Sequence, residues 1–256
     1  MKKRLIVSLL VFVLVLVISI FIAYGHEEDQ TYMTEKPNIY PVTTWQVVGY
    51  GTLAFGILVV IMLLFHTKMN NNIKRLVFFL VVTVTSLVTI FLIVSTLHLN
   101  IVSQSKGPVH WHADYEIWDC NNQIQLFAPS GLSNEQGTGM LHSHDDNRIH
   151  VEGVLMDIKS ASLGAFFQAI GGYLNDDSYK VISRNGIVEV HNGDSCNGQP
   201  ASLHVFVNGK LIEHPDDYVI SPYENVPPGD RINIIFTEKP VDQIDPYIQN
   251  DHAKLK

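Results

Sequence analysis

The first hundred residues hold three long apolar segments, and the rest of the chain alternates between apolar and polar positions. The segments cover residues 5–23, 44–65 and 76–97, and none of them contains a charged residue. About 20 apolar residues suffice to cross a bilayer as a helix, so the pattern predicts three transmembrane helices. Charges inside a membrane mark ion or substrate pathways. Their absence argues against a transporter or channel and favours a membrane anchor.

The first apolar segment also has features of a signal peptide. Ala23 and Gly25 are small residues that precede His26 in the pattern of a signal-peptidase site. Cleavage there would leave His26 as a free N-terminus, whose amine and ring can chelate copper. Because the segment is long for the apolar core of a signal peptide, we interpret it as a retained helix and leave cleavage open.

Basic residues predict how the anchor is oriented. The N-terminus begins Met-Lys-Lys-Arg, and the loop 66–75 carries Lys68, Lys74 and Arg75. Short loops rich in Lys and Arg stay in the cytoplasm, so the chain after residue 98 is predicted to lie outside. The expected protein is a multi-pass protein of the cell membrane. It has an anchor over residues 1–98, an extracytoplasmic domain over 107–239 and a polar tail over 240–256.

Strict alternation begins in the segment 109–118. The odd positions are apolar, whereas the even positions hold His110, His112, Asp114, Glu116 and Trp118. A period of two is typical of a strand with one buried face and one polar face. His110 and His112 are therefore expected to project side by side, with the two carboxylates farther along the same face.

A second histidine-rich segment repeats this spacing at residues 141–153. His142 and His144 lie two positions apart, as do His150 and Glu152. The sequence Asp-Asp-Asn-Arg at 145–148 is typical of a turn. If this turn closes a hairpin, the first pair folds back towards the second.

Imidazoles beside carboxylates, without thiolates, suit Cu²⁺ or Zn²⁺. The sequence contains neither a Cys-x-x-Cys motif nor any other close cysteine pair. We therefore expect a site for a copper or zinc ion, in which carboxylates hold the imidazole tautomers. The expected ligands are His110, His112, His142, His144 and His150, and the expected supporting carboxylates are Asp145, Glu152 and Glu116.

Other interpretations of the same residues stay open. One is a metal-dependent enzyme in which Glu116 or Glu152 acts as general base. The spacing from His110 through His112 to Glu116 is similar to the first metal motif of cupins, which are double-stranded β-barrels. The cupin Pro-x-Gly is missing before His142. Another interpretation is a structural or partner-binding domain with a hydrogen-bonded histidine cluster, so whether the protein is an enzyme is left undecided.

Charge and cysteine content narrow the compartment and the partners. The formal net charge is −8 with no basic patch, which argues against a nucleic-acid partner. Cys120 and Cys196 both fall in the domain expected outside the membrane, where disulfides persist, so we expect them to be bonded. A thiolate in a metal site is the alternative. The expected partners are the membrane and either a second copy of the chain or another membrane protein.

The remaining patterns predict an α+β domain. Residues 162–172 are typical of a short helix with Ser162 as its N-cap, and Asn185-Gly186 and Asn208-Gly209 are turn signals between strands. The order strand, strand, helix, strand, strand suggests a β-grasp-like fold: a mainly antiparallel sheet covered by one helix.

Several motifs together resemble a family of uncharacterised membrane-anchored archaeal and bacterial proteins. That family has a His-x-His strand, a Leu-His-Thr-His-Asp segment, an Ile-His-x-Glu segment, a Leu-Gly-x-Phe-Phe helix and a Val-Asn-Gly-Lys turn. The matching stretches cover roughly the last three fifths of the chain: 110–112, 141–145, 149–153, 163–167 and 207–210. Ser143 replaces the usual Thr. The resemblance implies a membrane-anchored extracytoplasmic domain and brings no established activity.

Overall fold

The computed structural model describes residues 43–129, 134–220 and 229–246. The chain divides into two compact units, Met1–His98 and Leu99–Lys256. The predicted segment 5–23 and the cleavage position after Gly25 lie outside the described residues.

The first unit consists of apolar helices. Helix α2 (Thr44–Phe65) covers the same residues as the second predicted segment, and helix α3 (Asn71–Val102) extends beyond the third at both ends. Both are long and apolar enough to cross a membrane, and only 6% of the apolar window of each is buried. A core helix of a soluble protein would be mostly covered, so the low burial of these two helices suggests association with a membrane. The described residues thus hold two candidate spans, and the three-helix prediction is wrong for them.

Local contacts explain how these helices form. Helix α2 begins with a capping box, in which the Thr43 side chain accepts from the Gln46 backbone and the Gln46 side chain accepts from the Thr43 backbone. In helix α3 the Thr85 hydroxyl donates to the Val81 carbonyl at 2.9 Å. The polar group of Thr85 is thus hydrogen-bonded within its own helix. Gly51 leaves room for Val88, because a Cβ atom there would collide with the valine side chain.

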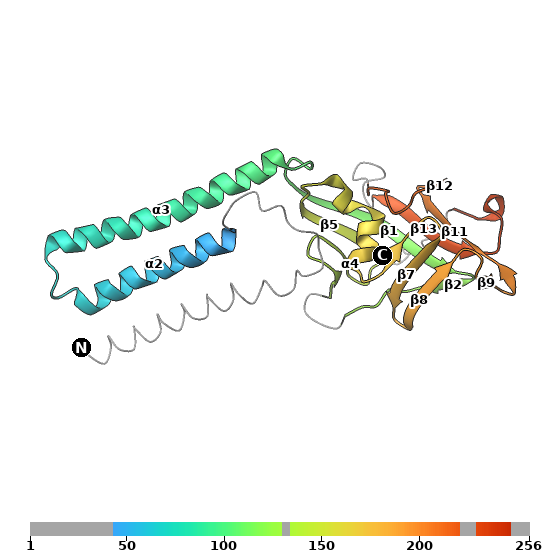
Figure 1. The fold of residues 1–256 in the computed structure, drawn as a ribbon, viewed down its shortest axis with the longest axis horizontal. Helices are drawn as coiled ribbons and strands as arrows, with labels where there is room; N and C mark the ends of the chain where they lie inside the picture. Colours follow the sequence, from blue (N-terminus) through green and yellow to red (C-terminus); the bar gives the residue numbers. More distant parts are fainter. Residues whose placement is uncertain (1–42, 130–133, 221–228, 247–256) are drawn as a thin grey trace, which may run out of the picture. The chain divides into compact units, whose positions relative to one another are not determined.

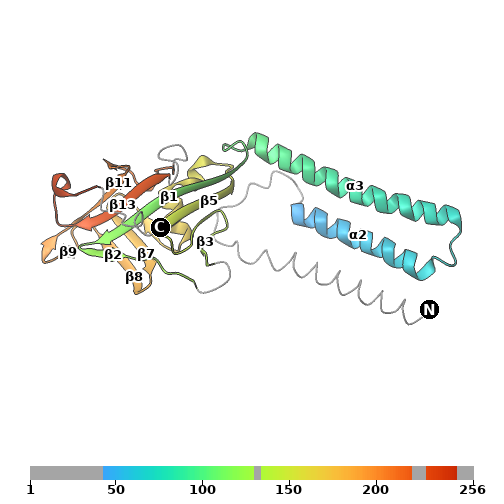
Figure 2. The same ribbon diagram turned by 180° about the vertical axis from the view of Figure 1, so that it is seen from behind.

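The second unit is built on a mixed sheet (Figure 1; Figure 2). In order across the sheet, its strands are β12 (Lys210–Leu211), β11 (Ser202–Val207), β13 (Asp230–Thr237), β1 (Pro108–Asp119), β5 (Arg148–Val154), β4 (Leu141–Ser143) and β3 (Gln136–Gly137), and β2 (Asn122–Ile124) also pairs with β1. Strands β1 and β13 are parallel, and the other pairs are antiparallel.

The parallel pair of β1 and β13 makes the sheet mixed, which the sequence pattern does not predict. Alternation reveals a strand but carries no information about the direction of its neighbour, and β13 comes from more than a hundred residues downstream. The predicted order of four strands and one helix is also too simple. The domain also contains two smaller sheets. One consists of β6 (Tyr173–Leu174), β7 (Ser178–Ser183) and β8 (Gly186–His191), and the other is a hairpin of β9 (Ser195–Cys196) and β10 (Gln199–Pro200).

Helix α4 (Leu163–Ala169) covers one face of the main sheet. Ser162 is its N-cap, as predicted, and accepts from the Ala165 backbone N–H. The rings of Phe166 and Tyr115 lie 5.7 Å apart, which places the odd-numbered side chains of β1 on the α4 side. Side chains alternate along a strand, so the even-numbered side chains of β1 lie on the opposite face of the sheet. The described elements also include two short 3-10 helices, η2 (Ile158–Ala161) and η3 (Val241–Gln243).

A disulfide fixes the end of β1. It joins Cys120, directly after the strand, to Cys196 in β9, with a Cα–Cα distance of 5.5 Å across 76 residues of sequence. This is the pair that the sequence analysis expects to be bonded. In the chain-entropy model, closing such a loop stabilises the folded chain by about 4 kcal/mol.

Candidate metal centre

Three neighbouring strands place their histidines in one row. His112 on β1 is the cross-strand partner of His150 on β5, and His150 is in turn the partner of His142 on β4. Adjacent strands are about 4.8 Å apart, and directly opposed side chains lie on the same face. The three imidazoles therefore meet on the sheet face opposite helix α4.

Two further histidines extend this row, because residues two apart on a strand share a face. His110 lies next to His112, and His144 lies next to His142. Their ring centroids are 4.7 Å and 4.6 Å apart, respectively. We call the five residues the histidine cluster; its members are His110, His112, His142, His144 and His150.

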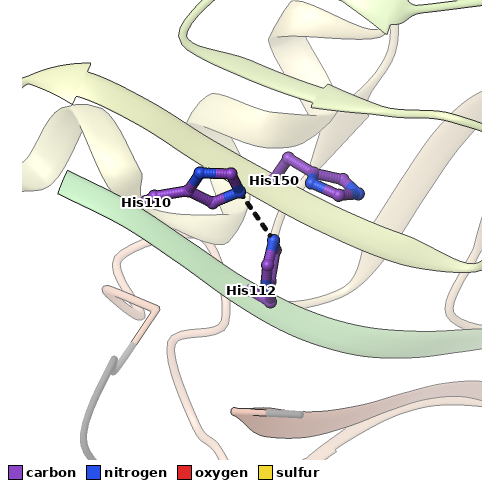
Figure 3. A group of neighbouring side chains, drawn as sticks. All are labelled: His110, His112 and His150. Carbon is purple, nitrogen blue, oxygen red and sulfur yellow. Dashed lines mark hydrogen bonds between the residues drawn. The ribbon is translucent and has the colours of Figure 1, made fainter. Parts of the chain in front are cut away.

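The histidine cluster contains two groups that can hold a metal ion, with candidate ligand atoms all within 4.8 Å of one another. The outer group comprises His110, His112 and His150 (Figure 3). The inner group comprises His142, His144 and His150. His150 belongs to both. These are all five histidines that the sequence suggests as ligands.

The outer group is open to solvent. The His110 side chain is 61% exposed, and its Nε2 atom lies 2.9 Å from Nε2 of His112, as the dashed line in Figure 3 indicates. Two nitrogens bound to one ion at about 2.05 Å are about 2.9 Å apart at a right angle and about 3.3 Å apart at a tetrahedral angle. The His110 and His112 nitrogens already have the spacing of neighbouring ligands.

The inner group has one buried member and is held by the backbone. His142 is only 2% exposed. Its Nδ1 atom lies 3.0 Å from the Thr138 carbonyl, and Nδ1 of His144 lies 3.3 Å from the Asn134 carbonyl. A carbonyl accepts only, so each Nδ1 must carry a hydrogen. Each Nε2 is then left as the nitrogen with a lone pair for a metal.

Two carboxylates contact the histidine cluster. Glu152, the cross-strand partner of His110, places Oε1 at 3.2 Å from its Nε2. Asp146 places Oδ2 at 3.2 Å from Nε2 of His150. Such partners fix the orientation of a ligating imidazole and raise its basicity. Sequence reasoning anticipated Glu152 and missed Asp146.

The structure assigns Asp145 a different role from the predicted one. Its carboxylate forms an ion pair with Arg184 on the loop between β7 and β8. Asp145 and Asn147 both have positive φ, 68° and 54°, and this tight turn directs Asp146 towards His150. Asp146 lies four residues before His150 in the sequence, and the turn between them brings the two side chains into contact. This spacing is the only signal in the sequence that points to Asp146.

Glu116 also lies away from both metal groups. It is buried, and its Oε2 accepts from Trp118 Nε1 at 3.0 Å. The next cross-strand row after His112 and His150 is the ion pair of Asp114 and Arg148, at 2.7 Å. Glu116 lies beyond that row, about 13 Å along the strand from His112.

The surroundings favour neutral imidazoles. Burial lowers the pKa of His112, and the neighbouring His150, His110 and Arg148 lower it further. Burial also lowers the pKa of His142, although the Thr138 carbonyl opposes this. Neutral imidazole is the form that binds a metal, so the cluster keeps these two residues ready for that role.

Asp146 remains ionised beside these rings. Burial opposes its charge, but hydrogen bonds from His150 and from backbone N–H groups outweigh burial and lower the pKa of the carboxyl.

A third group of possible ligands in the described residues is Asp119, Cys120 and Cys196. Its two sulfur atoms are joined in the disulfide, so they are not thiolates available to an ion.

Comparison with protein-family models, curated proteins and solved structures gives no match. The resemblance to membrane-anchored archaeal and bacterial proteins therefore stays a prediction from motifs. The fold itself bears on the cupin alternative: across the described residues the main sheet is open, with β12 and β3 at its edges, whereas a cupin is a closed barrel. Within the part of the chain that the structure describes there are thus two apolar helices, a disulfide-bonded domain and two histidine groups able to hold a metal.

Proposed function

We propose that this protein is a membrane-anchored binding protein for Cu²⁺ or Zn²⁺, and that the histidine cluster holds the ion. The observation that carries this proposal is the gathering of five imidazoles on one sheet face, in two groups of three with a shared member. An exposed strand face normally mixes polar residue types. Four histidines on three neighbouring strands, with His144 directly after β4, concentrate one type of ligand.

The chemistry of the ligands supports copper first and zinc second. Imidazole binds both metals, and affinity for nitrogen ligands is highest for Cu²⁺ along the first-row series. The Nε2 atoms of His110 and His112 face each other at 2.9 Å, a hydrogen-bond contact that puts both nitrogens within reach of one ion. Asp146 and Glu152 add negative charge beside the rings, which attracts a cation.

We place the domain outside the cytoplasm, on a multi-pass anchor. The basic loop at residues 66–75 supports a cytoplasmic turn between the apolar helices. The disulfide between Cys120 and Cys196 fits an oxidising compartment. Protease added to intact spheroplasts should digest the domain. Digestion only after lysis would place it inside.

A metal-dependent enzyme is the second candidate. Each group offers three imidazoles, and catalytic zinc sites combine three protein ligands with one open position for water. Glu152 lies next to the exposed outer group, where a general base would be needed. Hydrolysis of activated esters by the zinc-loaded protein, lost in Glu152→Gln with zinc still bound, would favour the enzyme over the binding protein.

Metal titration of the full-length protein in detergent micelles tests the proposal. The protein should carry no affinity tag rich in histidine and should be titrated with Cu²⁺ and Zn²⁺ at pH 7.5 by calorimetry. We expect at least one metal to bind with Kd below about 10 μM. The variant His191→Gln is the control, because His191 lies on β8 and contacts Tyr173 rather than the histidine cluster. Failure of both metals to bind would leave the histidines as a structural hydrogen-bonded cluster.

A further inference from the structure

His150 occupies the centre of the histidine cluster. Its strand β5 lies between β1 and β4, so the outer group is on one side of it and the inner group on the other. Its ring stacks on His142 with an interplanar angle of 1° and a centroid distance of 5.3 Å. It also meets His112 and His144 edge to face, at 4.7 Å and 4.9 Å. No other member belongs to both metal groups.

The number of nitrogens available sets how many ions the cluster can hold. The Nδ1 atoms of His142 and His144 face backbone carbonyls, which leaves one nitrogen on each ring for a metal. His110 and His112 turn their Nε2 atoms towards each other and so offer one nitrogen each to the outer group. Two ions with three imidazole nitrogens each need six, and the five rings supply six if His150 uses both of its own.

We propose that the histidine cluster binds two metal ions, one in each group, with the imidazole of His150 bridging them. This inference rests on the proposed function, since it assumes that the histidine cluster binds metal at all. A neutral imidazole has one lone pair and one N–H. When the second ion binds, the N–H proton of His150 leaves to the solvent, and the ring becomes an imidazolate with a lone pair at each nitrogen.

Asp146 makes this proton loss feasible. Its carboxylate lies 3.2 Å from Nε2 of His150 and accepts the N–H before the second ion arrives. After the proton has left, the same carboxylate faces the ion and offsets part of its charge.

Copper spectroscopy on the full-length protein in detergent micelles tests the bridge. Added Cu²⁺ should bind to two equivalents per chain. The electron paramagnetic resonance signal should rise during the first equivalent and decline during the second, because an imidazolate bridge couples the two unpaired electrons antiparallel. Calorimetry in two buffers of different ionisation enthalpy should show one more proton released for the second ion than for the first.

Variants separate the bridge from two independent sites. His144→Gln should bind one ion with an undiminished signal, since only the outer group remains complete. His150→Gln should lose both high-affinity ions, and His191→Gln should behave like the parent. Saturation at one equivalent, or a signal that grows linearly to two equivalents, would overturn the bridge while leaving metal binding intact. Absence of any bound copper would instead overturn the proposed function.

Discussion

The outer and inner groups of the histidine cluster are built from the same residue type but are held differently. In the inner group, His142 is buried and the Nδ1 atoms of His142 and His144 face backbone carbonyls. In the outer group, His110 is mostly exposed, and its Nε2 atom faces the side chains of His112 and Glu152. Backbone carbonyls fix a ring before an ion arrives, so less freedom is lost on binding.

If the histidine cluster binds metal as proposed, the two groups should differ in affinity and in exchange rate. A preorganised and buried group should bind tightly and exchange slowly, whereas an exposed group of freer side chains should load and release an ion faster. We therefore expect the inner group to have the higher affinity and the outer group to be the entry point for the ion.

Removing one pair of ligands at a time should have the largest effect on the metal affinities of the two groups. His142→Gln with His144→Gln should weaken the tighter binding step by about 1,000-fold or more, about 4 kcal/mol. His110→Gln with His112→Gln should remove the weaker step and leave the tighter one. Glutamine preserves size and polarity, and circular dichroism should verify that both variants fold. Equal losses in the two double variants would mean that the groups are equivalent.

Opening the disulfide tests whether the groups depend on the end of β1. Cys120→Ser with Cys196→Ser should lower the free energy of unfolding of the domain by about 4 kcal/mol, measured by chemical denaturation. Both metal affinities should change by less than about threefold, because β1 is also held by β5 and β13 along its length. A selective loss in the outer group would show instead that the disulfide positions His110 and His112.

The carboxylates next to the rings should have smaller effects. Asp146→Asn should reduce affinity about 10- to 100-fold, because Asp146 contacts the shared His150 and supporting carboxylates typically contribute that much. The matched control is Asp145→Asn. Asp145 pairs with Arg184, so this neighbouring change should leave both affinities near those of the parent. An equal effect of the two variants would point to general charge attraction rather than to a specific contact.

The smallest expected effect is on stability against pH. The pKa of His112 and that of His142 lie below the ordinary value of 6.5 in the fold, so the unfolded chain binds more protons just below pH 6.5. Stability without added metal should therefore fall as the pH drops through 6.5, by less than about 1.4 kcal/mol per pH unit for each histidine. Thermal unfolding at pH 7.5 and 5.5 measures this slope.

Single variants assign the pH dependence to one group or the other. His142→Gln should remove the contribution of the inner group to the dependence of stability on pH, and His112→Gln should remove that of the outer group. His191→Gln should leave it unchanged, since His191 lies outside the histidine cluster. A slope that survives both cluster variants would place the responsible protons elsewhere in the domain.

Much of the site follows from local patterns. The period of two puts His110 and His112 on one face of a strand, and the same rule pairs His142 with His144. The turn at 145–148 predicts the return to His150. Likewise, the apolar run at 44–65 coincides with helix α2, because a helix whose side chains are all apolar is recognisable from composition alone.

The features that the sequence did not predict depend on contacts between residues whose relative positions are set by the folded sheet. The parallel partner of β1 begins at Asp230, and nothing in the alternation of β1 specifies that direction. Asp146 contacts His150 whereas Asp145 pairs with Arg184, and the residue types of the turn do not distinguish these two adjacent carboxylates. Glu116 shares the face of His112, but a shared face does not imply contact along a strand that rises about 3.3 Å per residue.

Local patterns in the sequence predict the strands that carry the histidines, helix α2 and the face on which each histidine lies, because these depend on neighbours a few positions away. Only the tertiary structure decided that His112, His150 and His142 are opposed across three strands, and that His150 therefore belongs to both groups. Register is the physical reason. A slip of one residue would turn every histidine of a strand to the other face, so the site exists only in the pairing that the folded sheet selects.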